Sequence, residues 1–391
     1  MKYLYISFLC LSTSMYSAAQ IYELPNPSAS VGDYFGSSVA IRNNIALVGA
    51  NGADLCGANS GAAYIYTFEE ETGHWTESAS LQPENCLEGM SFGRSVALGD
   101  STAVVSSFRE TPIADIPNSV FVFRLQPDGS WKREARLIGS FIGKEGAFAS
   151  SLSMHGERIA ISSSGDASAR QYGGSVYIFE RNSDGRWKET HRITVPRERS
   201  SGIFGGEAVL SGDFLAVTAP SYSDNGKGSL YVFEFDQGEW VLSNRFRGLD
   251  DYTLTMDASD SFIIVGEKSD GDDSSGSATL FVRNDDGDWT RKQILKPVSP
   301  FELGAFGTGV AVSDDLALVV GYDEQLQFEF NIDRVVYVFG YDQDGGYWRQ
   351  RHIVDIGDVF FGSALDIDKR VALIGRASDT TVGQAVIVHL H

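Results

Sequence analysis

The chain has 391 residues, of which 42% are hydrophobic and 12% aromatic, so it contains enough apolar material for a large ordered core. Its formal net charge of -21 disfavours binding to nucleic-acid phosphates and to anionic lipid surfaces, since both interactions need clustered lysine or arginine. We therefore expect no nucleic-acid partner.

Residues 1–19 have the pattern of a secretory signal peptide. Lys2 supplies a positive flank, a mostly apolar stretch runs from Tyr3 to Met15, and Ser17-Ala18-Ala19 is a small-residue cleavage site. The apolar stretch is too short to span a bilayer, and no later segment reaches about 18 apolar residues, so no membrane insertion is expected. The prediction is one domain of residues 20–391 that is secreted or extracellular, and periplasmic or surface-associated if the source is bacterial.

The tryptophans mark a repeated unit. Each follows a turn rich in glycine and acidic or polar residues, and each precedes a short stretch typical of a strand. The six are Trp75, Trp131, Trp187, Trp240, Trp289 and Trp348. Their spacing of roughly 50–60 residues indicates an array of one supersecondary unit. We expect each tryptophan to cover apolar surface while its indole N–H stays near water.

Four short strands are predicted in the first unit. In chain order they are Phe35–Ile41, Ile45–Ala50, Gly61–Phe68 and Trp75–Leu81. The same sequence pattern begins again at Phe92, Phe148, Phe204, Phe306 and Phe361, and a degenerate form of it begins near Tyr252.

Seven such units without helical periodicity predict an all-β fold, a seven-bladed β-propeller of four-stranded antiparallel blades. The seventh unit ends after its third strand, Gln384–Leu390, and Ile21–Pro25 lies just before the first unit. We therefore expect the N-terminal strand to complete the last blade and close the ring, which leaves few exposed strand edges. The repeated phenylalanine is expected to fill the space between blades, and the glycine after it to allow close backbone approach.

The phrase Phe-Gly-x-Ser-Val-Ala, followed by Ala-Leu-Val-Gly-Ala and Gly-Ala-Ala-Tyr-Ile-Tyr, closely resembles the FG-GAP repeat, the blade unit of integrin-α-type β-propellers. The best matches are residues 35–50, 92–106, 204–220, 306–321 and 361–375. The resemblance implies the fold and leaves the function open. In integrin-like repeats the hairpin between the first two strands often carries an Asp-rich calcium loop. The corresponding hairpins are short here, so this calcium role is not carried over.

The loops between second and third strands share one face of such a propeller with the linkers between blades, and this face is the expected binding surface. Cys56 lies in such a loop of the first unit, and Cys86 lies in the linker to the second. A Cys56–Cys86 disulfide is therefore predicted, with a stabilisation of about 3 kcal/mol. The alternative is two unrelated free thiols.

Evidence for metal or catalytic chemistry is sparse. Asp270, Asp272 and Asp273 are weak candidates for a calcium site, and a solvated loop is the alternative. The chain contains no Gly-x-Ser-x-Gly elbow, zinc motif or phosphate loop, so we expect neither a cofactor nor an enzyme.

The function predicted from sequence is a secreted, monomeric, non-catalytic binding module that presents variable loops to an extracellular or cell-surface protein or glycan. The candidate anchor residues on the loop face are Phe108, Arg109, Tyr172, Tyr222, Tyr322 and Phe328. One alternative is an extracellular hydrolase or lyase that acts on polysaccharide or lipid through carboxylates at the propeller mouth. Another is a structural wall or matrix component.

Overall fold

The structure is a computed structural model. It describes residues 20–109, 117–140, 147–164, 173–195, 203–220, 227–249, 254–270, 275–284, 286–299, 304–322, 334–355, 363–378 and 380–390. The predicted signal peptide lies outside these residues. Within the described ranges, no helix is long and apolar enough to cross a membrane.

The described strands form seven four-stranded antiparallel sheets, which confirms the predicted blades. Blade 1 contains β2 (Phe35–Arg42), β3 (Ile45–Ala50), β4 (Ala62–Glu69) and β5 (His74–Leu81). Blade 2 contains β6 (Phe92–Leu98), β7 (Thr102–Ser107), β8 (Ser119–Leu125) and β9 (Trp131–Leu137). Blade 3 contains β10 (Phe148–His155), β11 (Arg158–Ser163), β12 (Ser175–Arg181) and β13 (Trp187–Ile193). Blade 4 contains β14 (Ala208–Ser211), β15 (Phe214–Ala219), β16 (Gly228–Asp236) and β17 (Glu239–Leu249).

The remaining blades follow the same order. Blade 5 contains β18 (Leu254–Ala258), β19 (Phe262–Glu267), β20 (Ser277–Arg283) and β21 (Trp289–Leu295). Blade 6 contains β22 (Val310–Val312), β23 (Leu316–Tyr322), β24 (Arg334–Asp342) and β25 (Tyr347–Asp355). Blade 7 contains β26 (Ser363–Asp368), β27 (Val371–Arg376), β28 (Gln384–His389) and, from the start of the chain, β1 (Gln20–Glu23).

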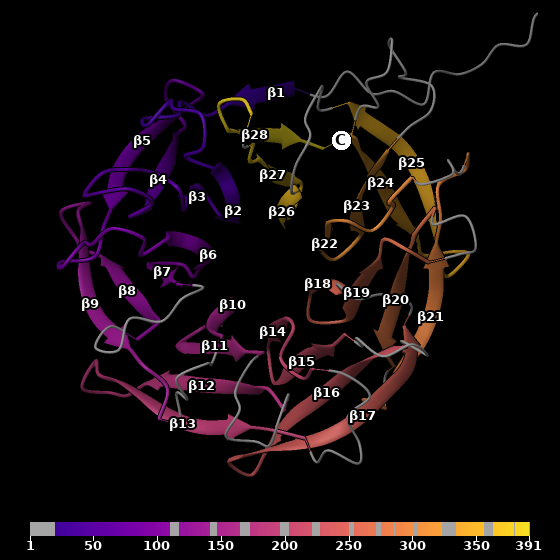
Figure 1. Cartoon of the computed structure of the whole chain (residues 1–391). Coiled ribbons are helices and arrows are strands. Elements are labelled where there is room, and N and C mark those ends of the chain that lie inside the picture. Colours follow the sequence, from indigo (N-terminus) through magenta and orange to yellow (C-terminus); the bar gives the residue numbers. More distant parts are fainter. Residues whose placement is uncertain are drawn as a thin grey trace, which may run out of the picture.

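The blades stand around a central axis, with the first strand of each blade innermost and the fourth on the outer rim (Figure 1). In blade 7 the outer position is taken by β1, which pairs antiparallel with β28 in the register Ile21↔Val388 and Glu23↔Val386. This pairing is consistent with the predicted closure of the ring. Residues from the two ends of the chain lie side by side in one sheet (Figure 1).

Hydrophobic cores lie at the seams between blades. Each of the seven clusters of buried residues in the described chain combines strands from two neighbouring blades. The repeated phenylalanines Phe35, Phe92, Phe148, Phe204 and Phe306 are all 0–1% exposed and belong to these clusters. The expected packing role is therefore confirmed for these five phenylalanines, whereas Phe361 and Tyr252 lie outside the described residues.

Neighbouring blades also touch through their backbones. At the seam between blades 1 and 2, Gly61 forms an isolated parallel bridge with Phe92, and the Phe92 N–H donates to the Ser60 carbonyl at 3.1 Å. The next residue, Gly93, has a φ of 92°, and a Cβ atom there would overlap the carbonyl oxygen of Ala62. Glycine is required at this position because both the conformation and the space exclude a side chain.

The expectation that the tryptophan N–H stays near water is wrong for four of the six residues. The indole Nε1 atoms of Trp75, Trp240, Trp289 and Trp348 are buried and have no hydrogen-bond partner among the described residues. Other aromatic rings cover these indoles, as Phe214 does for Trp289 with ring centroids 4.7 Å apart. Packing against these rings decides the burial, and it leaves the polar end of the indole enclosed.

Blade 3 departs from the glycine rule, since Ala149 stands in the glycine position with a φ of 69°. An alanine in this left-handed region costs roughly 1–2 kcal/mol, part of which is offset by the lower entropy of its unfolded state. Ala149→Gly should therefore raise the free energy of unfolding by roughly 0.5–1 kcal/mol, measured by thermal and urea unfolding. Gly93→Ala is the matched control and should lower it. Equal stability of Ala149→Gly and the wild type would contradict the strain.

Candidate functional site

The two faces of the propeller differ in how their connections are built. One face carries the loops between second and third strands together with the linkers between blades, and we call it the loop-rich face. Residues 51–61 of blade 1 and the linker of residues 82–91 are its best-described parts. The opposite face carries tight hairpins such as Asn43-Asn44.

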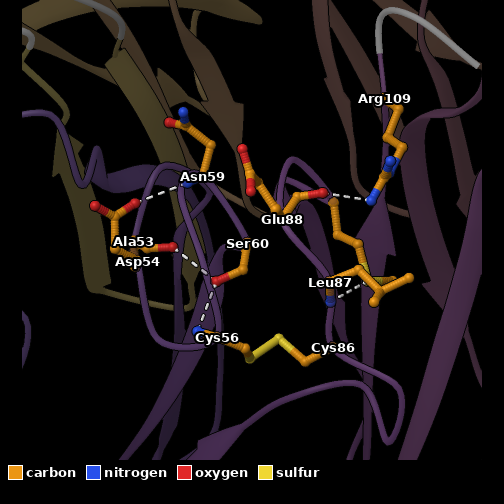
Figure 2. The surroundings of a disulfide bond; sticks show 10 residues. Ala53, Asp54, Cys56, Asn59, Ser60, Cys86, Leu87, Glu88 and Arg109 are labelled. Carbon is orange, nitrogen blue, oxygen red and sulfur yellow. Dashed lines mark hydrogen bonds between the residues drawn. A yellow bond between two sulfur atoms is a disulfide. The ribbon is translucent and has the colours of Figure 1, made fainter.

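The predicted disulfide is present on the loop-rich face. Cys56 and Cys86 are bonded with a Cα–Cα distance of 5.9 Å, which is ordinary for a disulfide (Figure 2). The Cys56 N–H donates to Ser60 Oγ at 3.1 Å, and Ser60 Oγ donates to the Ala53 carbonyl at 3.1 Å. Beside the disulfide, the Gly89 N–H donates to the Ala58 carbonyl at 2.7 Å. The blade 1 loop and the following linker are thus fixed to each other by covalent and hydrogen bonds.

Arg109, a predicted anchor for a ligand, connects two parts of the protein. It is 9% exposed, and its Nη2 donates to the Glu88 carbonyl at 2.5 Å (Figure 2). Its backbone N–H donates to Asn118 Oδ1 at 2.7 Å. The guanidinium of Arg94 lies over the ring of the neighbouring Phe108, with Cζ of Arg94 4.8 Å from the ring centroid. Both residues are therefore held by contacts with blade 2 and the linker before it.

The other predicted residues do not gather at one place. Tyr322 lies at the end of β23, where its hydroxyl accepts hydrogen bonds from Arg334 at 3.2–3.3 Å. Asp270 is half-buried, with Oδ2 3.8 Å from the ammonium nitrogen of Lys296. Tyr172, Tyr222, Phe328, Asp272 and Asp273 lie outside the described residues, so their roles stay predictions. In the part of the chain that the structure describes, no group of three or more His, Cys, Asp or Glu side chains could hold a metal ion.

Removing the disulfide tests how firmly this part of the face is held. Cys56→Ser with Cys86→Ser should lower the free energy of unfolding by up to about 3 kcal/mol, because the bond closes a loop between residues 30 apart. Thermal unfolding with and without a thiol reductant measures the effect. Reductant should destabilise the wild type to the same extent and leave the double variant unchanged. A reductant effect on the double variant would point to another cause.

A central channel of about 820 Å³ is lined by the innermost strands of all seven blades. Among the acidic side chains of its wall are Glu207, Asp257 and Asp366, which the sequence analysis did not single out. They come from blades 4, 5 and 7. By strand register, Ala40 of β2 and Ala97 of β6 stand where β18 and β26 have their aspartates. One side of the channel is therefore acidic and the other is not.

Each of these carboxylates accepts a backbone hydrogen bond from the next blade. Asp257 Oδ2 accepts the N–H of Val312 at 2.7 Å, and Asp366 Oδ2 accepts the N–H of Ile41 at 2.7 Å. In blade 3, Ser153 Oγ accepts the N–H of Leu210 at 3.0 Å from the corresponding position.

Glu207 lies just before β14, and its Oε2 accepts the N–H of Met256 in blade 5 at 2.6 Å. An innermost strand is an edge strand, so part of its backbone N–H groups finds no partner in its own sheet. The carboxylates supply those partners across the seams.

Burial raises the pKa of all three carboxyl groups. For Glu207 the pKa rises to about 8, since the loss of water outweighs the hydrogen bond from Met256 that favours the carboxylate. For Asp257 burial is again the main cause of the raised pKa, and the negative charge of Asp366 adds to it. The pKa of Asp366 is raised by burial as well.

A signal for these residues exists in the sequence. When the blades are aligned on their Phe-Gly pairs, Asp366 falls where the first and second units have alanine. A single strand does not reveal these residues. Polar and apolar residues alternate along a short strand, so a polar residue there is ordinarily assigned to the solvent-facing side.

Glu207 should make the protein less stable at alkaline pH. The folded protein holds this proton up to about pH 8, whereas an ordinary glutamate releases it near pH 4.5. Its stabilising contribution is therefore complete below about pH 4.5 and is lost as the pH rises through 8.

The Tm of the wild type should accordingly fall more between pH 5.5 and about 9 than that of Glu207→Gln. We expect a difference of a few degrees, since about 1 kcal/mol moves the Tm of a large domain by roughly 2–4 °C. Glu71→Gln, which changes an exposed residue, is the control and should follow the wild type. Parallel pH profiles for the wild type and Glu207→Gln would contradict the raised pKa.

A family model described as FG-GAP repeat matches residues 24–66 and 75–123, which contain most of blades 1 and 2. The same Phe-Gly phrase and the same four-stranded sheet recur around the ring. The chain is an FG-GAP repeat β-propeller protein. A sequence comparison with curated proteins finds no match.

Solved structures similar to this FG-GAP propeller share its fold at low sequence identity. The Pseudomonas aeruginosa periplasmic gluconolactonase PpgL is 13% identical, with a TM-score of 0.52 over 83% of this chain and 86% of that chain. The WD40 repeats of RRP9 are 10% identical, with a TM-score of 0.55 over 96% and 98%. U3-55K is 10% identical, with a TM-score of 0.55 over 95% of this chain and 98% of that chain. Likeness at this identity extends to the propeller fold alone.

Proposed function

We propose that this FG-GAP propeller is an extracytoplasmic, non-catalytic binding module that holds an extracellular protein or glycan on its loop-rich face. The observation that carries the proposal is the cross-linking of this face by the Cys56–Cys86 disulfide and the Arg109–Glu88 hydrogen bond. Loops that are fixed before binding lose less conformational entropy when a partner is bound. A structural disulfide also fits an oxidising compartment.

The chemistry of the channel supports the same proposal. Glu207, Asp257 and Asp366 already accept backbone N–H groups from neighbouring blades, so each has a structural task. Such a task accounts for these polar residues without a reaction.

Binding can be tested by presenting the purified protein to a glycan array and to extracts of cell-surface proteins, with and without calcium. We expect saturable binding that is weakened by changes on the loop-rich face. Glu207→Gln, which changes the channel alone, should leave it unaltered. Binding that is lost in Glu207→Gln and kept in every loop variant would contradict the proposal. Loss of binding in a calcium chelator would show that binding needs a cation.

A hydrolase is the second candidate, because carboxyl groups with raised pKa values in a cavity are typical of acid–base catalysis. A panel of lactones and polysaccharides tests it, since one propeller of similar fold is named a gluconolactonase. Turnover that disappears in Glu207→Gln and Asp257→Asn, with the fold retained, would replace the binding proposal with this one.

A further inference from the structure

Four large aliphatic side chains are exposed on consecutive parts of the loop-rich face. Val31 is 58% exposed, Leu55 45%, Leu87 42% and Val382 39%. They come from the segment before blade 1, the blade 1 loop, the linker to blade 2 and the loop of blade 7. We call these four residues the aliphatic sector. Exposed apolar side chains that gather on one surface mark an interaction site more often than isolated ones do.

Backbone contacts and the disulfide connect the segments that carry the members of the sector. Val31 and Val382 form an isolated antiparallel bridge between the N-terminal segment and blade 7. The Gly52 N–H, three residues before Leu55, donates to the Asp33 carbonyl at 3.1 Å. Leu55 and Leu87 each adjoin one cysteine of the disulfide. The sector therefore follows a strip of connected backbone segments across blades 7, 1 and 2.

The backbone beneath the strip is fixed on both sides. The side-chain amide of Asn26 donates to the Gly383 carbonyl at 3.0 Å, which holds the N-terminal segment on blade 7. The disulfide holds the blade 1 loop against the linker. Aliphatic side chains on such a base offer apolar area at a small entropic cost.

The charges beside the strip are negative. Asp54 and Glu88 lie next to Leu55 and Leu87 in sequence, both are exposed, and neither forms an ion pair with any residue that the structure describes. The nearby Glu84, by contrast, is paired with Arg133. Arg109 adds little positive charge at the surface because it is 9% exposed. The strip is thus apolar with an acidic border.

These features discriminate between possible occupants. Sugars stack on aromatic rings, and the exposed residues of the sector are aliphatic. An anionic lipid surface and a second copy of a chain with a net charge of -21 would both be repelled by the acidic border. A polypeptide with apolar side chains flanked by lysine or arginine satisfies both the strip and its border.

We infer that the aliphatic sector is the docking site for a partner protein, which it binds through an apolar segment flanked by basic residues. This inference rests on the proposed binding function and narrows its ligand to a protein. Leu55 and Leu87 supply the apolar contact, and Asp54 and Glu88 attract the basic flanks.

The probe is a random-peptide display library selected on the immobilised purified protein, followed by affinity measurement of the enriched peptides in solution. We expect enriched peptides to combine apolar residues with lysine or arginine. Leu55→Ser with Leu87→Ser should weaken their binding by about tenfold or more. Val241→Ser with Ile294→Ser removes equally exposed aliphatic residues from β17 and β21, and it should leave the affinity within about twofold.

A second pair of variants tests the acidic border. Asp54→Asn with Glu88→Gln should slow association and reduce the salt dependence of binding. These changes are on the surface, so circular dichroism and thermal unfolding should match those of the wild type. Acidic enriched peptides, or equal binding to the Leu55→Ser/Leu87→Ser variant, would overturn the inference.

Other outcomes separate this inference from the proposed function. If binding is lost in Ile138→Ser with Val298→Ser, which changes exposed residues elsewhere on the loop-rich face, the inference fails and the binding function stands. If no change on the loop-rich face affects peptide binding, both the inference and the proposed binding function are overturned. Sector-dependent sedimentation with phosphatidylserine vesicles, or sector-dependent dimers in analytical ultracentrifugation, would replace the partner protein with a lipid surface or a second copy.

Discussion

Close approach of neighbouring blades at the Phe-Gly pair is the constraint on which the ring depends. Backbone meets backbone there, as in the Gly61–Phe92 bridge, so the distance between two blades is set before any side chain contributes. The phenylalanine ring then fills the wedge that opens behind this contact. A single short motif thereby fixes both the spacing and the hydrophobic core of a seam, and its repetition produces a circular array.

The inner wall of the ring solves a second problem, that of unpaired edge strands. A propeller exposes one edge of each blade to its channel, and the backbone N–H groups there need partners. This protein supplies some of them with side chains such as Asp257 and Asp366, which reach across a seam to the next blade. Polar residues inside the channel are therefore part of the cohesion of the ring.

The fold could be derived from the sequence to the level of single strands, because the strands of one repeat can be aligned with those of the others. The disulfide followed from topology, since Cys56 and Cys86 both emerge on the loop-rich face. The channel carboxylates were not found, because their partners lie in another blade, about 50 residues away for Glu207 and Asp257 and 325 for Asp366. Their positions become visible only when seven imperfect units are aligned. The enclosure of the Trp289 N–H was likewise beyond the sequence, because it depends on how Phe214 packs against the indole.

The position of β1 has a consequence for how the molecule forms. Its partner β28 lies at the other end of the chain, with Gln20 opposite His389. Blades 1 to 6 can each assemble from consecutive strands as the chain is synthesised, whereas blade 7 must wait for β28 at the other end of the chain. The first strand has to remain unpaired throughout that interval, so the late stage of folding is one long-range encounter. Its rate is governed by loop-closure entropy rather than by local strand propensity.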